Sequence, residues 1–284
     1  MNKNNMNHTM IHRIVLAAAS LVLLCSQHVA GQTMRGDFNM DGSVNLTDVT
    51  TMISYMINER LPYAEPVKDT VTVNGVPFVM VRVQGGAYSR ELYTSHTVGD
   101  FSIGLTEVTV EQWNAVMTDE PINDQQGQWK QCPASNMNWT ACQRFVTRIN
   151  ELTGLQFSLP TEDEWEYAAG GGRLTRAYHY AGSNTPDDVA WHMGNAGTSY
   201  FYGLPVATKA PNELGLYDMS GNVWEWCLDN RDYPNTTYFF AMRGGCVSNT
   251  ADKCKVTSKI NMRADTDENN GIRYGFRLVL HSGQ

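Results

Sequence analysis

The stretch PNELGLYDMSGNVWEWC, residues 211–227, decides the kind of fold this chain can adopt. It crowds two tryptophans and three acidic residues between glycines and asparagines that interrupt regular structure. Short segments broken by Gly, Asn and Pro continue from here towards the C-terminal end. Together with a few clear helices upstream, this pattern indicates an α+β fold rich in ordered loop and excludes a repeated βα unit.

The upstream elements are easier to delimit. Residues 77–89, PFVMVRVQGGAYS, have the composition of a strand that ends at two glycines. Residues 101–117 pass from a strand into a helix with Thr109 as its N-cap, and residues 139–154 predict a helix that ends at Gly154. In residues 157–172, Thr161 and Glu164 predict a capping box that opens a third helix. Its acidic first turn, residues 162–166, is attributed to the helix dipole and given no catalytic role.

Several motifs occur in a fixed order: VRVQGGAY, TEVTVEQWNAVM, LPTEDEWEYAA, PNELGLYDMSGNVWEWC, RGG and GFRLVL. They resemble the formylglycine-generating enzyme family, the sulfatase-modifying factors, over roughly residues 77–280. We therefore expect such a domain over residues 77–284. The resemblance implies an α+β, C-type lectin-like fold with few regular elements, much ordered loop and structural calcium.

In the catalytic members of that family, the resemblance implies two C-terminal cysteines that bind copper(I) as thiolates and oxidise a sulfatase cysteine to formylglycine. In RGGCVSNTADKCK, residues 243–255, Cys254 matches the second of these cysteines and Asn249 replaces the first. Cys246 falls on a serine three residues earlier, about 10 Å away in an extended chain. A single thiolate is a poor copper(I) site, so we expect neither copper nor catalysis.

Three interpretations of Cys246 and Cys254 remain open. In order of preference they are two separate buried thiols, a disulfide worth about 2–3 kcal/mol through loop closure, and a displaced reactive pair.

The resemblance also implies a calcium ion in the main domain. Matched one by one, its ligands would be Asp218, Gly221, Val223 and Glu225, which combine two anionic oxygens with two backbone carbonyls. The alternative is a buried turn in which Glu225 is hydrogen-bonded to backbone amides. A second family calcium site would fall near Asp188–His192, without identifiable ligands.

Residues 36–57, GDFNMDGSVNLTDVTTMISYMI, predict a separate calcium site. Oxygen donors at alternate positions, with a glycine at the sharp turn, follow the twelve-residue loop of an EF-hand, and an apolar helical stripe comes next. The predicted ligands are Asp37, Asn39, Asp41, Ser43, Asn45 and Asp48. The loop resembles one repeat of a type I dockerin. Dockerins carry two repeats and this chain shows one, so either a cohesin-like partner or a calcium-stiffened cap is expected.

The N-terminal segment predicts export. A basic residue, an apolar run of about a dozen residues and small residues before Gln32 indicate a signal peptide over residues 1–31. Lipid attachment at Cys25 is the lesser alternative. No transmembrane segment is expected after cleavage, and the net charge of −8 without a basic stripe excludes a nucleic-acid binder. The calcium repeat would occupy residues 32–60, and residues 61–76 are predicted to be a linker.

These observations favour an exported, non-catalytic protein that binds a protein or carbohydrate ligand. Loops 228–240 and 247–273 would form the binding surface, because Asn, Asp, Thr and Tyr give adaptable hydrogen bonds and rigid aromatic area. The alternatives are a formylglycine-generating oxidase and a dockerin-tethered component of a polysaccharide-degrading system.

Overall fold

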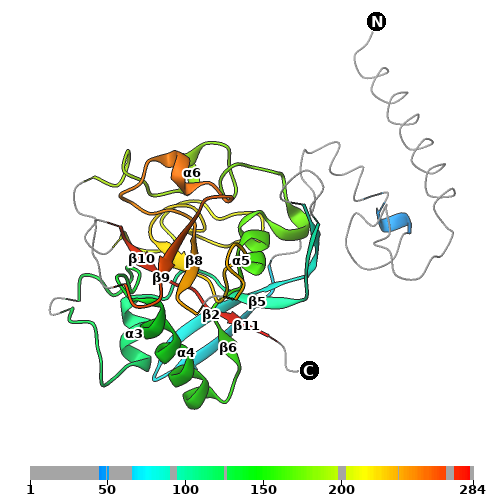
Figure 1. Ribbon diagram of the computed structural model, residues 1–284. Helices are drawn as coiled ribbons and strands as arrows, with labels where there is room; N and C mark the ends of the chain where they lie inside the picture. Colours follow the sequence, from blue (N-terminus) through cyan, green and yellow to red (C-terminus); the bar gives the residue numbers. More distant parts are fainter. Residues whose placement is uncertain are drawn as a thin grey trace, which may run out of the picture. The chain divides into compact units, whose positions relative to one another are not determined.

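The computed structural model describes residues 45–48, 50, 66–89, 95–124, 127–197, 203–235, 237–266 and 272–281 (Figure 1). The chain divides into two compact units, Met1–Glu65 and Pro66–Gln284. The predicted signal peptide, Cys25 and the predicted ligands Asp37, Asn39, Asp41 and Ser43 lie outside the described residues. In the described part of the chain, no helix combines the length and apolarity needed to cross a membrane.

A five-stranded sheet forms the base of the second unit, with strand order β1-β2-β5-β11-β6. Its strands are β1 (Lys68–Val73), β2 (Val76–Val83), β5 (Phe101–Gly104), β6 (Phe157–Ser158) and β11 (Val279–Leu280). All neighbouring pairs are antiparallel. The C-terminal strand therefore lies between two strands made much earlier in the chain.

The expected linker over residues 61–76 is wrong for its second half, which forms β1. Lys68 to Val73 pair with Val81 to Val76 of β2. The connecting residues Asn74 and Gly75 have φ angles of 49° and 83°. Asn-Gly with positive φ at both positions is the preferred two-residue turn of a hairpin, a signal that the mixed charge of this stretch concealed.

The three predicted helices are confirmed. α3 (Val110–Val116) begins at Thr109, which forms a capping box with Gln112. α4 (Trp139–Thr153) ends at Gly154, whose left-handed φ of 70° closes the last turn. α5 (Glu162–Ala169) starts with the predicted box between Thr161 and Glu164.

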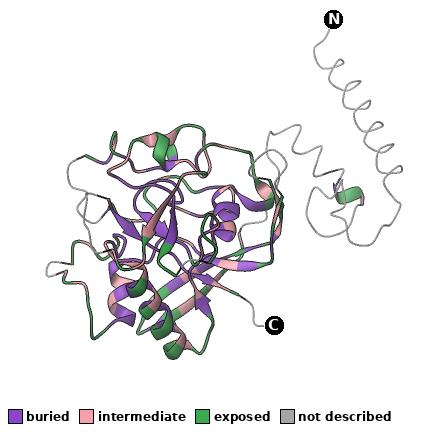
Figure 2. Cartoon of the chain, viewed as in Figure 1, coloured by how far each residue is buried: buried purple, intermediate pink, exposed green. Residues whose placement is uncertain are grey.

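α3 contacts β2, and α4 contacts β1 and β6 (Figure 1). Aromatic rings join these layers: Trp113 stacks on Phe145 at 5.4 Å between ring centroids, and Phe145 meets Phe276 edge-on at 5.1 Å. Figure 2 shows the buried residues gathered inside this arrangement. The core thus ties the sheet to the C-terminal segment.

A second sheet carries the C-terminal half, in the order β10-β7-β8-β9. Its strands are β7 (Trp224–Trp226), β8 (Phe239–Arg243), β9 (Lys259–Arg263) and β10 (Tyr274–Gly275), and a small hairpin pairs β3 (Gly86–Tyr88) with β4 (His96–Val98). Only short helices, η1 (Gly172–Leu174) and α6 (Pro186–Val189), interrupt the described chain between α5 and β7, and η2 (Ala251–Cys254) follows β8. The expected α+β architecture with much ordered loop is confirmed.

Candidate functional site

The loop after β8 holds the two cysteines of interest. Gly244 and Gly245 both adopt positive φ, at 91° and 78°. A Cβ atom on Gly245 would lie 2.9 Å from the Cys254 sulfur. The double glycine therefore lets the end of the strand pack directly against the residue at the family's second cysteine position.

The chain folds back immediately after the glycines. The Asn249 amide donates to the Cys246 carbonyl at 2.9 Å, and the Cys246 sulfur lies 3.2 Å from Asn249 Oδ1. The expectation that Cys246 sits about 10 Å from this position is wrong, because it assumed an extended chain. A tight turn brings the residue at the serine position and the residue at the first cysteine position into contact.

Asn249 is the centre of this turn. Its side-chain oxygen accepts from the Trp224 indole at 2.7 Å and from the Cys246 amide at 3.1 Å, in addition to the thiol. Its carbonyl accepts from the Met193 amide at 2.9 Å. Asn249 thus connects β7, the loop at residue 193 and the cysteine loop, and its amide oxygen is fully engaged.

Cys254 lies in a small apolar cluster with Tyr180, Val189 and Ala190. Burial, and then the neighbouring Cys246, raise the pKa of Cys254 to about 12. All five described cysteines, which are Cys132, Cys142, Cys227, Cys246 and Cys254, are free and buried. The preferred interpretation of separate buried thiols is therefore the one found, and no disulfide joins described cysteines.

The acidic first turn of α5 binds arginines. Arg231 donates to Glu162 at 2.7 Å and to Glu166 at 2.8 Å, and it also pairs with Asp163. Arg243 of β8 is completely buried and donates to Glu166 at 3.1 Å. Attributing these acids to the helix dipole alone is incomplete, because the Glu162 and Glu166 side chains are 0% and 6% exposed. They anchor loop 228–240 to α5.

Exposed aromatic residues lie on the far part of that anchored loop. Tyr233, Tyr238 and Phe239 are 54%, 68% and 42% exposed, and the rings of Tyr233 and Phe239 lie 6.3 Å apart. The next residue, Phe240, is buried and stacks on Trp139 of α4 at 3.8 Å. The loop therefore presents rings outward from a fixed base. Loop 247–273 contributes η2 and β9 beside it.

Of the predicted main-domain calcium ligands, Glu225 forms a buried ion pair with Arg277. Glu225 Oε2 accepts from Arg277 Nε at 2.6 Å and from the Trp165 indole at 2.7 Å, and Oε1 accepts from Arg277 Nη2 at 2.7 Å. Asp218 Oδ2 accepts from the Ala207 amide at 2.7 Å, whereas Oδ1 has no hydrogen-bond partner among the described residues. Burial raises the pKa of Asp218 to about 6.

The segment around the second family calcium site is held by protein groups. His192 lies 2.8 Å from Asp187, and Ser183 donates to Asp188 at 3.0 Å. Of the predicted EF-hand ligands, the described Asn45 and Asp48 cap a helix: the Asn45 amide donates to the Asp48 carboxylate at 2.7 Å. Within the described residues, no cluster of three His, Cys, Asp or Glu side chains has metal-site geometry.

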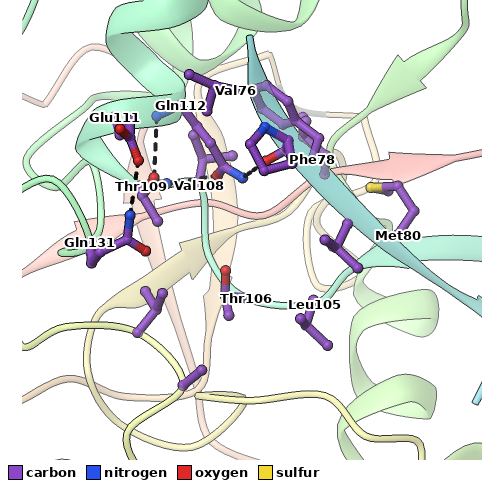
Figure 3. A pocket seen from close by; sticks show the side chains of 16 residues that line it. Val76, Phe78, Met80, Leu105, Thr106, Val108, Thr109, Glu111, Gln112 and Gln131 are labelled. Carbon is purple, nitrogen blue, oxygen red and sulfur yellow. Dashed lines mark hydrogen bonds between the residues drawn. The ribbon is translucent and has the colours of Figure 1, made fainter. Parts of the chain in front are cut away.

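A cavity of about 250 Å³ opens beside β2 and α3 (Figure 3), and no residue of the cysteine loop lines it. Its walls are mainly apolar, with Val76, Phe78, Met80, Leu105 and Val108 labelled in the figure. Its polar side chains pair with protein groups: Gln112 donates to the Pro77 carbonyl and Gln131 to Glu111, both at 2.9 Å. These two side-chain amides are therefore already hydrogen-bonded within the protein.

Comparison with known proteins identifies the scaffold. Residues 59–282 match the model of the sulfatase-modifying factor enzyme 1-like domain. The chain belongs to this family. It is 35% identical over 253 residues to the chaperone protein LppX of Paenibacillus barcinonensis, an alignment that covers 70% of this chain and 88% of that protein. Among solved structures, Treponema denticola variable protein 1 superposes with a TM-score of 0.65 at 28% identity, covering 76% of this chain and all of that chain.

Relatives named for formylglycine generation match a shorter part. The inactive C-alpha-formylglycine-generating enzyme 2 of Mus musculus is 33% identical over 138 residues, 44% of each chain. The formylglycine-generating enzyme of Streptomyces coelicolor is 31% identical over 151 residues, 44% of this chain and 48% of that enzyme. The chain thus spans about half the length of these relatives. The α+β, C-type lectin-like fold of the sulfatase-modifying factor family is confirmed.

The copper site of the catalytic members does not fit these residues. Copper(I) requires soft, deprotonated sulfur ligands. This member of the family has Asn249 at the first position, with its oxygen engaged by three donors, and a Cys254 thiol whose pKa is about 12.

The family calcium set fits in part. Asp218 retains an oxygen without a partner, whereas both oxygens of Glu225 are engaged by Arg277 and Trp165. The alternative interpretation, in which backbone amides donate hydrogen bonds to Glu225, also differs from the observed pairing with side chains.

The sequence alone did not identify Arg231, Arg243, Arg277 and the buried acid Glu107 as important residues. The three arginines lie in the stretches NRD, RGG and GFR. Their position beside the family motifs was the sequence feature that could have identified them.

Proposed function

We propose that this protein is a non-catalytic, exported ligand-binding member of the sulfatase-modifying factor family. The proposal depends on the position and the hydrogen bonds of Asn249. It occupies the first cysteine position, and its side-chain oxygen accepts three hydrogen bonds, so it cannot supply the missing thiolate. The similarity to a relative named as inactive supports this interpretation. Export rests on the predicted signal peptide over residues 1–31.

The ligand surface that we propose is formed by loops 228–240 and 247–273. Three exposed aromatic side chains lie on the first loop, and the ion pairs of Arg231 fix its base. Anchoring the base of the loop reduces the entropy that the loop loses on binding, which favours affinity. The relative named a chaperone protein supports a protein as the ligand in preference to a carbohydrate. Calcium in the loop at residues 37–48, with a cohesin-like partner, remains an additional proposal from the sequence.

Two assays test this function. Purified protein is incubated with copper(I), oxygen and a CxPxR peptide, beside the Streptomyces coelicolor enzyme as a positive control. We expect no 18-dalton loss from the peptide cysteine, and such a loss in this protein would establish the oxidase alternative. Catalysis is thereby separated from binding.

Binding is measured separately, on a surface-displayed peptide library and on a glycan array. The double variant Tyr233→Ser/Tyr238→Ser is expected to lose the selected peptides. The control Leu152→Ser/Leu155→Ser, which removes exposed apolar side chains near the end of α4, is expected to keep them. Equal loss in both variants, or selection by the glycan array alone, would contradict a protein-binding loop.

A further inference from the structure

β9 is an edge strand of the second sheet. It is the last member in the order β10-β7-β8-β9, and among the described residues no strand or isolated bridge pairs with its outer side. An edge strand presents a row of backbone N–H and C=O groups that its own sheet does not use, and such a row can pair with another polypeptide. The outer side of β9 is therefore a candidate interaction surface.

One hydrogen bond just beyond β9 decides which of its backbone groups point outward. The Ala264 amide donates to the Tyr238 carbonyl at 2.8 Å, one position past the last pair of the β8–β9 ladder. Hydrogen-bonded and non-hydrogen-bonded pairs alternate along an antiparallel ladder, so Ile260 and Met262 bond to β8. The backbone groups of the intervening residues face the outer side. These residues are Lys259, Asn261 and Arg263.

Most of these outward groups are available for pairing. The Arg263 carbonyl accepts from the Thr266 amide at 3.2 Å, which closes a turn after the strand. The amides and carbonyls of Lys259 and Asn261 form no hydrogen bond with the part of the chain that the structure describes. They provide two donors and two acceptors in the alternation that an added strand requires.

The lysine of β9 does not protect this edge. Lysines on edge strands usually oppose unwanted pairing by carrying a charge into the solvent beside the strand. Lys259 instead turns towards loop 228–240 and α5, because its Nζ lies 2.5 Å from Asp232 Oδ2 and 3.5 Å from Glu162 Oε1. Only 14% of its side chain is exposed. The edge is thus open at its N-terminal end.

The two faces of β9 specify the side chains of an added strand. Ile260 and Met262 are half-buried and pack against the core, so apolar side chains at alternate positions would extend that face. On the other face β9 has Lys259 and Arg263 and no acid, which favours carboxylates opposite them. A second copy of β9 paired about Asn261 would instead place lysine opposite arginine, and like charges directly opposite are destabilising.

The exposed aromatic residues of loop 228–240 lie near the end of the same edge. Phe239 is directly opposite Arg263 in the β8–β9 register, and the exposed Tyr238 precedes it. A strand added to β9 would lie two strand spacings, roughly 10 Å, from β8. Large side chains on Phe239 and on the added strand can bridge this distance. The other edge considered, β1 in the first sheet, contains no aromatic residue.

We propose that β9 binds an extended peptide segment of a partner protein by strand addition. The segment places apolar side chains beside Ile260 and Met262 and carboxylates opposite Lys259 and Arg263. In this mode the backbone hydrogen bonds provide affinity and the alternating side chains provide specificity. The inference rests on the proposed function and names how its protein ligand is held.

The test uses the full chain and the peptides that it selects from the surface-displayed library. Asn261→Pro removes one outward N–H and leaves the ladder to β8 intact, because an edge strand tolerates proline where the missing donor faces outward. We expect this variant to bind the selected peptides about tenfold more weakly. Asn261→Ala keeps the N–H and is expected to bind like the parent.

β1 offers a matched control for the proline. The Arg82 amide donates to the Val67 carbonyl at 2.9 Å, so by the same alternation the Thr70 N–H faces the outer side of the first sheet. Thr70→Pro is therefore the same change at the other edge. It is expected to bind the selected peptides like the parent.

A second measurement leaves the protein unchanged. Each residue of a selected peptide is N-methylated in turn, and the Kd is measured by fluorescence anisotropy. Strand addition predicts a period of two, in which methylation of each N–H that faces β9 weakens binding about tenfold and methylation of the intervening residues changes it less than about twofold. This profile decides the question even if Asn261→Pro does not fold.

Several outcomes would overturn strand addition at β9 and leave a protein-binding function in place. They are selected peptides that still bind Asn261→Pro, a methylation profile without a period of two, and loss of binding in Thr70→Pro in place of Asn261→Pro. A dimer in solution that Asn261→Pro dissociates would assign the edge to a second copy of the chain. A library that yields no binding peptide would instead contradict the proposed function itself.

Discussion

The guanidinium of Arg277 binds the carboxylate of Glu225 through two hydrogen bonds, at 2.6 and 2.7 Å, and neither side chain has more than 1% of its surface exposed. The two residues lie 52 positions apart, one in β7 and one just before β11. They join the two sheets of the domain at its centre. The Trp165 indole adds a third hydrogen bond to the same carboxylate, at 2.7 Å.

Replacing Arg277 should therefore be severe. Arg277→Met leaves the Glu225 carboxylate buried without a counter-charge, and we expect the free energy of unfolding to fall by about 3–5 kcal/mol. Urea unfolding followed by tryptophan fluorescence measures the change. Arg263→Met, which removes an exposed pair with Asp265, serves as the control and should leave the midpoint unchanged. A similar loss in both variants would contradict the central role of the buried pair.

Asn249 should matter for stability although it cannot serve as a thiolate. Asn249→Ala removes the acceptor for the Trp224 indole and the Cys246 amide. Leaving these donors unsatisfied should cost about 2–4 kcal/mol, measured by urea unfolding. The neighbouring variant Ser248→Ala should cost about 0.5 kcal/mol. A neutral Asn249→Ala would show that the turn at residues 246–249 does not depend on this side chain.

The cysteines should be inert in the folded protein. Each of the five described thiols is buried, and burial raises the pKa of Cys254 to about 12 and that of Cys132 to about 11. Since the thiolate is the reactive form, Ellman's reagent at pH 8 should label these five only after denaturation. Prior reduction should leave the count after denaturation unchanged. Fast labelling of Cys246 or Cys254, identified by peptide mass, would restore the reactive-pair interpretation.

Glu213 should make stability depend on pH. Burial raises its pKa above the usual 4.5. An acid whose folded pKa is raised binds its proton more tightly in the folded state, so its ionisation weakens the fold as pH rises through that range. Glu213→Gln should therefore be more stable than the parent at pH 7, and this advantage should disappear below about pH 4. Tm values across pH 3–8 measure the difference. An advantage that grows towards acid would reverse the assigned sign.

The parts of the fold that the sequence predicts are those with local causes. The caps at Thr109 and Thr161 and the stop at Gly154 depend on residues within one helical turn, and all three are found. The motifs indicate the family because their order is long and specific. The Asn74-Gly75 hairpin was equally local, and it was missed because the charged residues around it were interpreted as a linker.

The parts that could not be predicted depend on distant partners. The acids of α5 meet Arg231 and Arg243 across 65 to 77 positions, so their burial is invisible in the helix itself. Likewise, the buried environment of Glu107 forms only when the backbone of Tyr217 pairs with that of Leu105. The contact of Cys246 with Asn249 is short-range, but it requires the positive φ angles of two glycines and a turn that spacing alone does not specify.

The position of β11 between β5 and β6 has a consequence for biosynthesis. Val279 and Leu280 supply hydrogen bonds to strands that leave the ribosome more than a hundred residues earlier. Until residue 280 is translated, β5 and β6 each have an open edge, and the domain cannot close its main sheet. The main sheet of this domain therefore closes only after the C-terminal strand has been synthesised, so the earlier strands wait for the last one to complete their pairing.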